Sequence, residues 1–429
     1  MNRLTIHHAR LLSGSASGHL LANPRDVLEV RLPILVQKFG GSSVADLDRL
    51  RKVARRIVET RRAGYDLVVV VSAMGDTTDE LLAMARELAP SPSRRELDML
   101  LSVGERISMT LLSMAIHQEG FEAISLTGSQ CGIITTSSHS NARIIDVRPF
   151  RVQDELAEGR IVIVAGYQGT SYKREVTTLG RGGSDTTAVA LAAALGAEAC
   201  EIYSDVDGVF SADPRVVLDA QKLESLGHEE MLEMARAGAK VLNEQAVEFA
   251  RRAKIALYAR STHEPRSRGT VIRPDGFEQR AALAERGRPA VAVSHIERGL
   301  WIRAAQSADA AFALLDDVDM VVTEWLPGSR LAAFLNVENL PEHEVLVESL
   351  EALGDDVRCD WRGCVSVVGQ GIGGVARWVR LASEKLVSQE PEMISIHPAR
   401  LSFVLPSEAT RESAKLLHDA LITKLEESS

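Results

Sequence analysis

Three segments in the first half of the chain combine charged side chains with glycines or further acids. In chain order they are Lys38 before Gly40-Gly41-Ser42-Ser43, Arg181 and Asp185 in a glycine-rich turn predicted from Thr177 to Asp185, and Asp205, Asp213 and Arg215 in an acid-rich loop. Glycine-rich turns leave backbone N–H groups free to bind phosphate, and nearby lysine or arginine neutralises its charge. A single lysine of this kind is more often a solvated surface charge. Three such segments, brought together by one sheet, favour a polyphosphate site.

Two familiar phosphate-binding patterns do not account for this site. The chain has no GxxxxGK[ST] motif, so a Walker loop is excluded. A GxGxxG pattern occurs at Gly369–Gly374 and would suggest a dinucleotide-binding oxidoreductase, but only about 55 residues follow it. A complete Rossmann unit has no room there. We therefore interpret Gly369–Gly374 as a tight loop between a strand and a helix.

A buried helix separates the second and third charged segments. Ala188–Leu195 is apolar on every side and stops at Gly196, so it is expected to pack beneath a sheet. Ser184 and Asp185 are predicted at the N-cap of this helix. A short strand at Glu201–Tyr203 follows.

Buried strands precede the charged loops. Ile34–Phe39, Leu67–Val71 and Ile161–Ala165 are apolar runs of the kind found in parallel sheets, and helices are predicted between them, for example from Asp46 to Arg62. Alternation of strand, loop and helix predicts an α/β fold whose ligand-binding loops lie at the carboxyl ends of the strands.

The C-terminal third has shorter elements in the order β-α-β-β-α, twice, which predicts a duplicated α+β unit. The predicted strands are Val291–Val293, Met320–Glu324, Leu331–Val337, Val365–Val368, Met393–Ile396 and Leu401–Leu405, and the helices are Ala308–Leu315, Glu342–Leu353, Val375–Val387 and Glu408–Ile422. Pro274–Pro289 is polar and charged, as linkers are.

The composition limits the partners. A chain of 429 residues can form two or three domains. A net charge of −10 and only 4% aromatic residues disfavour nucleic acid or an anionic membrane as the main partner. The four cysteines, Cys131, Cys200, Cys359 and Cys364, lack metal-ligand spacing, so we interpret them as reduced thiols.

The first thirty residues contain arginines, no acid before Asp26 and no apolar secretory core. This favours a flexible N-terminal extension over an organelle-targeting segment. No run reaches the ~20 apolar residues of a membrane span, so a cytoplasmic protein is expected.

Several motifs together resemble the aspartate kinases of the amino acid kinase superfamily. They are, in the order of that family, Val36–Val44 (VQKFGGSSV), Ser72–Asp79 (SAMGDTTD), Thr127–Gln130 (TGSQ), Asn141–Ile144 (NARI) and the stretch around Arg181. The resemblance runs from Val36 to about Arg273. The duplicated C-terminal units resemble, more loosely, the tandem ACT regulatory domains of the family.

The resemblance implies an amino-acid-kinase-like three-layer αβα sandwich with a mainly parallel sheet, followed by two ACT-like, ferredoxin-like units. The implied boundaries are an extension at 1–31, a catalytic domain at 32–275, a linker at 276–289 and ACT-like domains at 290–360 and 361–429. The implied activity is transfer of the ATP γ-phosphoryl group to the β-carboxylate of L-aspartate, giving 4-phospho-L-aspartate. This is the first step towards lysine, threonine and methionine, or ectoine.

The resemblance also implies residue roles. Lys38 would neutralise the transferred phosphoryl group, Asp185 would orient the lysines, Arg181 would clamp the α-carboxylate of aspartate, and Glu105 would hold its ammonium group. The remaining implied roles are a substrate pocket lined by Ser72, Thr78 and Ser184, phosphate contacts from Gly40, Gly41, Ser42 and Lys240, and a nucleotide site at Ser204, Asp205, Phe210, Asp213 and Arg215. ATP with Mg²⁺ is the implied cosubstrate, and no resident metal site is expected. Glu105 could instead be a surface acid, and Asp213, before Pro214, could only initiate a turn.

The implied chemistry needs no general base. A carboxylate acceptor with an ordinary pKa of about 4 is already ionised at neutral pH. Positioning and cancellation of charge repulsion then suffice, which lysine, arginine and backbone amides provide.

The sequence departs from the family at several places. Asn243-Glu244 stands where His-Pro is frequent, and Tyr167 where Phe is common. Arg303–Ala308 replaces an Asp-x-Pro-Gly loop, and Ile396–Arg400 replaces a polar segment. We therefore expect the C-terminal units mainly to form a homodimer, with feedback by lysine or threonine lost or altered. A catalytically silent amino-acid sensor, or a kinase for glutamate, acetylglutamate or a nucleotide, remain the alternatives.

Overall fold

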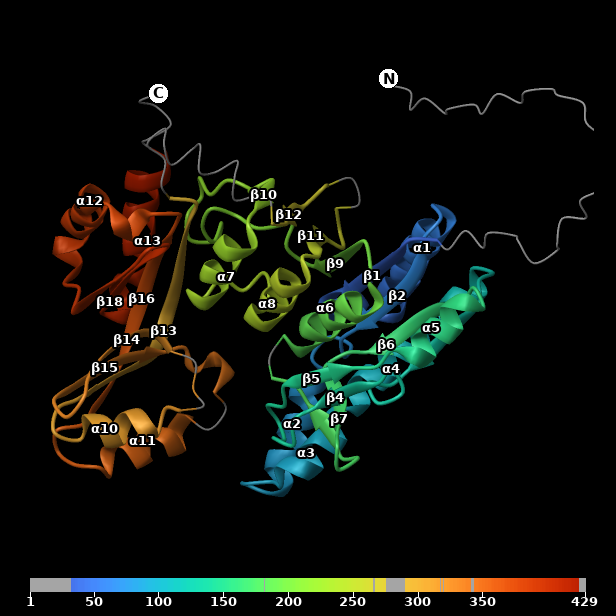
Figure 1. Ribbon diagram of the computed structural model, residues 1–429, viewed down its shortest axis with the longest axis horizontal. Coiled ribbons are helices and arrows are strands. Elements are labelled where there is room, and N and C mark those ends of the chain that lie inside the picture. The colour runs from blue at the N-terminus through green and yellow to red at the C-terminus, as the bar shows by residue number, and fades with distance from the viewer. Residues whose placement is uncertain are drawn as a thin grey trace, which may run out of the picture. The chain divides into compact units, whose positions relative to one another are not determined.

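The computed structural model describes residues 32–180, 182–264, 267–274, 290–316, 318, 320–340 and 343–423 (Figure 1). The predicted N-terminal extension, nearly all of the linker and Arg181 lie outside the described residues.

The first part of the described chain is built on an eight-stranded sheet. Its strands are β1 (Ile34–Phe39), β2 (Asp66–Val71), β3 (Ala123–Leu126), β6 (Ile161–Ala165), β9 (Ala199–Ser204), β10 (Ser225–Leu226), β11 (Ala256–Ser261) and β12 (Thr270–Ile272). They lie in the order β10-β12-β11-β9-β1-β2-β6-β3, and every neighbouring pair is parallel except β11 with β12. The continuous apolar runs of β2 and β6 are explained by burial on both faces of the sheet.

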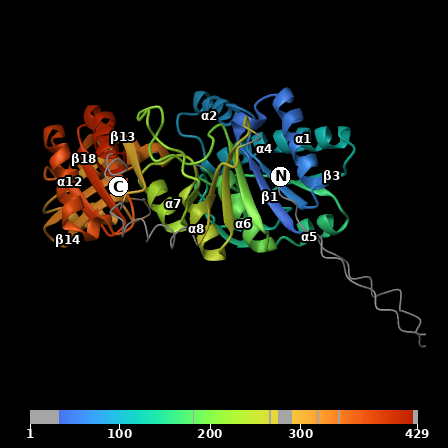
Figure 2. The same cartoon turned by 90° about the horizontal axis from the view of Figure 1, so that it is seen from above.

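Helices cover both faces of this sheet. On one face, α1 (Leu47–Arg62) and α4 (Val103–Gln118) pack on β1, β2 and β6. On the other, α5 (Phe150–Ala157), α6 (Gly183–Leu195), α7 (His228–Arg236) and α8 (Glu244–Ala253) form a second apolar core. Figure 2 shows β1 between α1 and α6. The predicted three-layer αβα sandwich is confirmed.

Smaller elements surround the carboxyl end of the sheet. They are η1 (Gly41–Val44), α2 (Thr77–Leu88), α3 (Arg94–Leu101) and a four-stranded sheet with the order β5-β4-β7-β8, made of β4 (Ile133–Thr135), β5 (Ile144–Val147), β7 (Gln168–Ser171) and β8 (Val176–Thr178). The residues from 177 were expected to form a turn, but Thr177 and Thr178 belong to β8, where cross-strand pairing with β7 extends the chain.

The C-terminal third forms one six-stranded antiparallel sheet. Its elements are β13 (Ala292–Ala304), α10 (Ala308–Ala313), β14 (Met320–Leu326), β15 (Arg330–Leu335), η2 (Val337–Asn339), α11 (His343–Glu351), β16 (Arg358–Val368), η3 (Ile372–Gly374), α12 (Ala376–Leu386), η4 (Val387–Gln389), β17 (Met393–His397), β18 (Arg400–Leu405), η5 (Ser407–Ala409), α13 (Thr410–His418) and η6 (Asp419–Thr423). The order β14-β15-β13-β16-β18-β17 confirms the duplicated β-α-β-β-α pattern. Gly369–Gly374 connects β16 to α12, as a tight strand-to-helix loop should.

Two strands are several residues longer than predicted. β13 and β16 are long strands that pair with each other along nearly their whole length. The pairing extends from Ala292 opposite Val368 to Arg303 opposite Arg358. The boundary placed at 360/361 therefore falls inside β16. A register shift between Ile296 and Gly299 interrupts the alternation of side chains in β13, which hides its full length in the sequence.

One helical stretch, Arg94–Gln118, is long and apolar enough to span a membrane by length and composition alone. Half of its most apolar part is buried, and Met109, Leu112 and Ile116 pack in the core beneath the large sheet. We interpret it as a core helix.

Candidate functional site

The predicted loops lie side by side at the carboxyl ends of β9, β1, β2 and β6. The backbone N–H of Gly40, just after β1, donates to the carbonyl of Tyr203 in β9 (3.1 Å). The N–H of Ser72, just after β2, donates to the carbonyl of Phe39 (3.1 Å), and Gly166 is bonded in the same way to the end of β2 (3.0 Å). The parallel sheet thus brings these segments together at the carboxyl ends of its strands, as a parallel sheet with crossover helices does.

Lys38 and Asp185 form an ion pair at this edge. The Nζ of Lys38 lies 2.6 Å from Oδ1 of Asp185, and both side chains are little more than one-tenth exposed. Lys38 comes from β1 and Asp185 from the first turn of α6. A cation and an anion that are both withdrawn from water hold each other in one place, so the ammonium is fixed where an incoming phosphate could reach it.

The predicted N-cap of α6 was wrong by two residues. Gly182, with a left-handed φ of +73°, is the N-cap, and Ser184 and Asp185 lie in the first turn. Glycine takes this backbone conformation without steric cost, which is why the turn before α6 ends there. Asp185 in the first turn is still favourably placed, because the helix dipole stabilises an anion near its N-terminus.

The glycine loop after β1 packs closely on the loop after β2. A side chain on Gly41 would place its Cβ 2.9 Å from the carbonyl oxygen of Ala73, and the N–H of Gly75 donates to the carbonyl of Gly41 (3.2 Å). The Cβ position of Gly40 is 3.5 Å from Nζ of Lys38. Glycines at these positions therefore leave room for the lysine and keep the two loops in contact. Ser42 lies within this loop, in η1.

Glu105 is a buried carboxylate with one unused oxygen. Its Oε1 accepts a hydrogen bond from the N–H of Ala73 (3.2 Å), whereas Oε2 is buried and has no hydrogen-bond partner among the described residues. Burial raises the pKa of Glu105 to about 7. In the same helix, Ser108 donates to the carbonyl of Ser72 (2.7 Å), which fixes α4 against this loop. A surface role for Glu105 is excluded, and an ammonium group would satisfy its free oxygen.

Of the remaining predicted substrate-binding residues, Ser184 and Thr78 are described by the structure and Arg181 is not. Ser184 packs against the end of β6, where its Oγ is 2.7 Å from the Cβ position of Gly166. Thr78 lies in the first turn of α2 and is half-buried. Arg181 lies outside the described residues, between Gly180 and Gly182.

The predicted nucleotide residues lie on the loop that follows β9. Ser204 ends that strand, and its Oγ accepts from the N–H of Val206 (3.2 Å), while Asp205 is exposed. Asp213 and Arg215 pair with each other (2.7 Å), and this hydrogen bond lowers the pKa of Asp213. The backbone of Asp213 also accepts two hydrogen bonds of a turn, so the pair needs no ligand to explain its geometry.

Phe210 lies on the same loop and forms an isolated backbone bridge with Lys222. Its side chain is half-buried.

Lys240 is directed to the C-terminal third of the chain. Its Nζ lies 2.5 Å from Oε1 of Glu338 in η2, and its side chain is 67% exposed. It is not among the residues paired with Lys38 or Asp185. In this structure Lys240 therefore contacts a carboxylate of the C-terminal third of the chain, and its predicted role toward phosphate stays a prediction.

Two residues for which the sequence predicted no role in the site support the glycine-rich turn. Asp98 of α3 is fully buried and accepts hydrogen bonds from Thr178, Ser140 and His139. Asn243 caps α8 and its amide lies 2.5 Å from the Cβ position of Gly182. An acid amid leucines at 97–101 was the one available signal for Asp98, since a charged residue on an apolar helix face requires partners.

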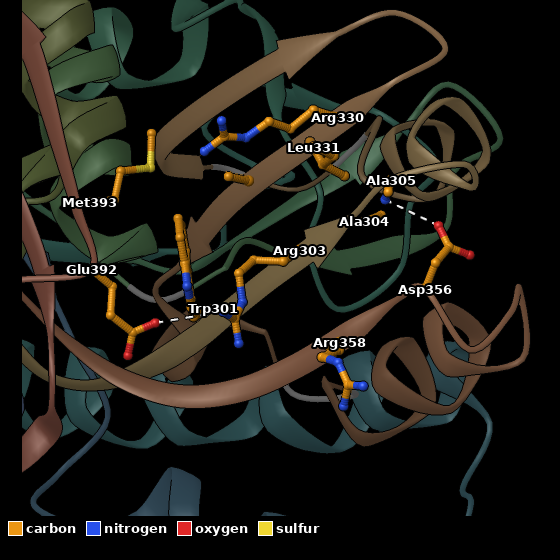
Figure 3. Close-up of a pocket in the computed structure, with 11 residues that line it drawn as sticks. Trp301, Arg303, Ala304, Ala305, Arg330, Leu331, Asp356, Arg358, Glu392 and Met393 are labelled. Carbon is orange, nitrogen blue, oxygen red and sulfur yellow. Dashed lines mark hydrogen bonds and ion pairs between the residues drawn. The ribbon is translucent and has the colours of Figure 1, made fainter.

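A separate cavity of about 490 Å³ lies in the C-terminal sheet (Figure 3). Its lining is Trp301, Arg303, Ala304, Ala305, Arg330, Leu331, Ala332, Asp356, Arg358, Glu392 and Met393. At one end, the Asp356 carboxylate accepts from the N–H groups of Ala305 (3.1 Å) and Ser307 (2.8 Å). These bonds to Ser307 and Ala305 lower the pKa of Asp356. The loop that replaces the Asp-x-Pro-Gly segment is thus bonded to a carboxylate of the chain itself.

Comparison with known proteins agrees with this architecture. The Amino acid kinase family matches residues 33–261, more than half of the chain. An aspartokinase of Corynebacterium efficiens is 45% identical over 408 residues, which cover 90% of this chain and 96% of that protein. The chain belongs to the aspartokinase family. The family resemblance inferred from the motifs is confirmed.

Two further family members describe the extent of the similarity. An aspartokinase of Mycobacterium tuberculosis is 61% identical over 242 residues, and the chain spans about 57% of the length of that relative. The solved structure of E. coli aspartokinase III in complex with aspartate and ADP superposes with a TM-score of 0.79, covering 90% of this chain and 99% of that one at 23% identity. At that identity the likeness establishes the fold, including the C-terminal units.

Proposed function

We propose that this member of the aspartokinase family transfers the γ-phosphoryl group of ATP to the β-carboxylate of L-aspartate. The observation that carries the proposal is the ion pair of Lys38 and Asp185 at the same sheet edge as the buried, half-satisfied Glu105. A carboxyl acceptor and an ammonium group on one small molecule match this combination of a fixed cation and a free buried carboxylate oxygen.

Each residue has a defined task in the proposed reaction. Lys38 lies against the negative charge that the transferred phosphoryl group carries, and Asp185 keeps the ammonium of Lys38 in place. Glu105 receives the substrate ammonium, and Arg181 reads the α-carboxylate through its planar fork. Ser72, Thr78 and Ser184 complete the substrate side. The β-carboxylate attacks as an anion, so no residue has to remove a proton.

The nucleotide is proposed to lie over the loop that follows β9. Ser204, Asp205, Phe210, Asp213 and Arg215 belong to this loop, beside the loop of Gly40, Gly41 and Ser42 whose N–H groups suit phosphate oxygens. Lys240 would join once released from Glu338. Magnesium in phosphotransferases takes most of its ligands from substrate phosphates and water, aided by one or two carboxylates, and it neutralises phosphate charge when bound.

We propose that the C-terminal ACT-like units form a homodimer. The proposed domains are a catalytic domain at 32–275, a linker at 276–289 and ACT-like units at 290–357 and 358–429, so that the second unit begins with β16. We also propose a cytoplasmic location and a substrate site specific for small molecules rather than nucleic acid or membrane. The E. coli aspartokinase III structures include one in complex with lysine and aspartate. For the present chain we propose that lysine and threonine feedback is lost or altered.

An acceptor survey tests the proposed activity. ATP-dependent hydroxamate formation is measured with L-aspartate, L-glutamate and N-acetylglutamate, and ADP release with these and with nucleoside monophosphates. Activity restricted to L-aspartate is expected. Turnover of another acceptor in preference to aspartate contradicts the substrate, and absence of turnover with every acceptor favours the silent amino-acid sensor.

A further inference from the structure

A buried polar cluster is hydrogen-bonded to Thr178, at the start of the glycine-rich turn. Asp98, at the centre of this cluster, is fully buried in α3. Its Oδ1 accepts from Oγ1 of Thr178 (2.5 Å) and from the N–H of Ser140 (3.0 Å), and its Oδ2 lies 2.6 Å from Nδ1 of His139. A carboxylate only accepts hydrogen bonds, so Nδ1 of His139 carries the proton.

The three donors come from two segments that are distant in sequence. Thr178 ends β8, two residues before Gly180, whereas His139 and Ser140 lie between β4 and β5. One buried carboxylate therefore joins α3, the β4–β5 connection and the start of the glycine-rich turn. Removing any donor leaves a buried charge less satisfied, which is costly in a low-dielectric interior.

The β4–β5 connection also contacts the turn directly. The N–H of Ala142 donates to the carbonyl of Thr178 (3.0 Å). Oδ1 of Asn141 lies 2.6 Å from where a Cβ on Gly180 would be, so the Asn141 side chain lies directly against the backbone of the turn. The position of the turn thus depends on the position of residues 139–142.

The charges of Asp98 and of the buried Glu105 both act on Tyr167. The side chain of Tyr167 has a pKa raised by its burial, and the charges of Glu105 and Asp98 add to this increase. The carbonyl of Tyr167 accepts from the N–H of Leu179 (2.8 Å), the residue that follows Thr178. Tyr167 therefore links the Asp98 cluster electrostatically to Glu105, the expected anchor of the substrate ammonium group.

We propose that Asp98 and His139 are positioning residues for aspartate: they hold the Thr178–Gly180 backbone, which directly precedes Arg181, the residue assigned to the substrate carboxylate under the proposed function. This proposal rests on the proposed function, and neither residue touches substrate. The role differs from general structural support, because the two residues fix one turn and affect the binding of aspartate but not of ATP.

The conservative variant separates these roles. Nδ2 of asparagine occupies nearly the place of histidine Nδ1, so His139→Asn can keep the bond to Asp98 whereas His139→Ala cannot. The KM for aspartate is expected to rise about tenfold in His139→Ala and in Thr178→Val, with kcat and the KM for ATP within twofold. His139→Asn should return the KM for aspartate to within about threefold of the original value. Exposed His397→Ala serves as the matched control and should change nothing.

An activity-independent measurement distinguishes failure of this proposal from failure of the proposed function. Hydrogen–deuterium exchange without substrate is expected to accelerate at residues 176–183 and 136–143 in His139→Ala, with the rest of the catalytic domain unchanged. Exchange that is unchanged there, or accelerated throughout the domain, overturns the positioning role whatever the substrate is. If exchange changes locally but the original protein does not phosphorylate aspartate, the proposed function fails and the clamp on the turn stands. An unchanged KM for aspartate in both His139→Ala and Thr178→Val also overturns it.

Discussion

The ammonium of Lys240 lies 2.5 Å from the carboxylate of Glu338, although the two residues are 98 positions apart. The pair joins the segment between α7 and α8 to η2 of the C-terminal region. A lysine expected to reach ATP phosphates is thus paired with a carboxylate of the C-terminal ACT-like region. Under the proposed function, ATP has to compete with Glu338 for this lysine.

Replacing Glu338 by glutamine is therefore expected to tighten ATP binding. Solvent-exposed ion pairs contribute roughly 0–1 kcal/mol, so the KM for ATP should fall by no more than about fivefold. The KM for aspartate should stay unchanged. Initial rates at saturating aspartate measure the effect, and Glu324→Gln, whose partner Arg330 is 3.6 Å away, is the control. A KM for ATP that rises or stays constant shows that Lys240 has no phosphate role that Glu338 restrains.

The ion pair of Lys38 with Asp185 predicts the largest losses of activity. Lys38→Ala removes the cation at the phosphoryl group, and Asp185→Ala leaves the ammonium of Lys38 without its carboxylate partner. In both variants kcat is therefore expected to fall at least a hundredfold. Both variants should stay folded by circular dichroism, because the pair lies at the carboxyl ends of the strands and outside the apolar core clusters on the two faces of the sheet. Near-original kcat in either variant removes the assigned role of that residue.

The free oxygen of Glu105 predicts an opposition between stability and binding. The pKa of Glu105 is about 7 in the folded protein and about 4.5 when unfolded, so the folded state binds the extra proton between these values. Stability contributed by this group therefore falls as pH rises from about 4.5 to 7, by roughly 3 kcal/mol in total. Glu105→Gln removes that penalty and should raise Tm above pH 7 but not below pH 4.

The same pKa determines how aspartate binding depends on pH. A substrate ammonium favours the ionised carboxylate, so the KM for aspartate of the original protein should rise as pH falls below about 7. Glu105→Gln should have a high KM for aspartate at every pH, without that rise. The measurement is KM for aspartate from pH 6 to 8.5 with the KM for ATP as reference. An equal pH profile in the two proteins contradicts the assignment of Glu105.

The sequence predicted the central sheet better than it predicted the contacts around it. Ile34–Phe39, Leu67–Val71 and Ile161–Ala165 were recognisable because strands buried on both faces are continuously apolar. Their order in the chain also placed Lys38 and Asp185 at one edge. By contrast, His139 and Thr178 are 41 and 80 positions from Asp98, and no local pattern relates residues so far apart.

The C-terminal region shows the same limit. The helices and the duplication followed from hydrophobic periodicity, but the full lengths of β13 and β16 depend on their mutual pairing. The N-cap of α6 was misplaced because capping preference favours Ser184 and Asp185, whereas the close approach of Asn243 requires a residue without a side chain at 182.

The carboxylate of Asp356 predicts weak or absent feedback by lysine and threonine. It already accepts hydrogen bonds from the N–H groups of Ala305 and Ser307 and from the Ser307 hydroxyl (2.8 Å), so an effector carboxylate meets a like charge at this loop. Rates measured with lysine and threonine, singly and together, are expected to stay within twofold at millimolar effector. Strong inhibition at low concentration refutes this expectation. Asp356→Asn is measured in the same way, and Asp355→Asn, at the neighbouring position, is its matched control.

Two glycines at the ends of α6 provide a matched test of the contact between the glycine-rich turn and Asn243. Gly182 and Gly196 both have left-handed backbones, with φ of +73° and +62°. A Cβ on Gly196 would meet nothing within 4 Å, whereas a Cβ on Gly182 would lie 2.5 Å from the Asn243 amide nitrogen. Gly196→Ala should therefore cost only the backbone penalty of roughly 1–2 kcal/mol and leave the KM for aspartate unchanged. Gly182→Ala should destabilise the protein further and raise the KM for aspartate at least tenfold, because the turn that carries Arg181 must move. Urea unfolding and initial rates on both variants check this, and equal effects of the two substitutions show that the Asn243 contact does not position the turn.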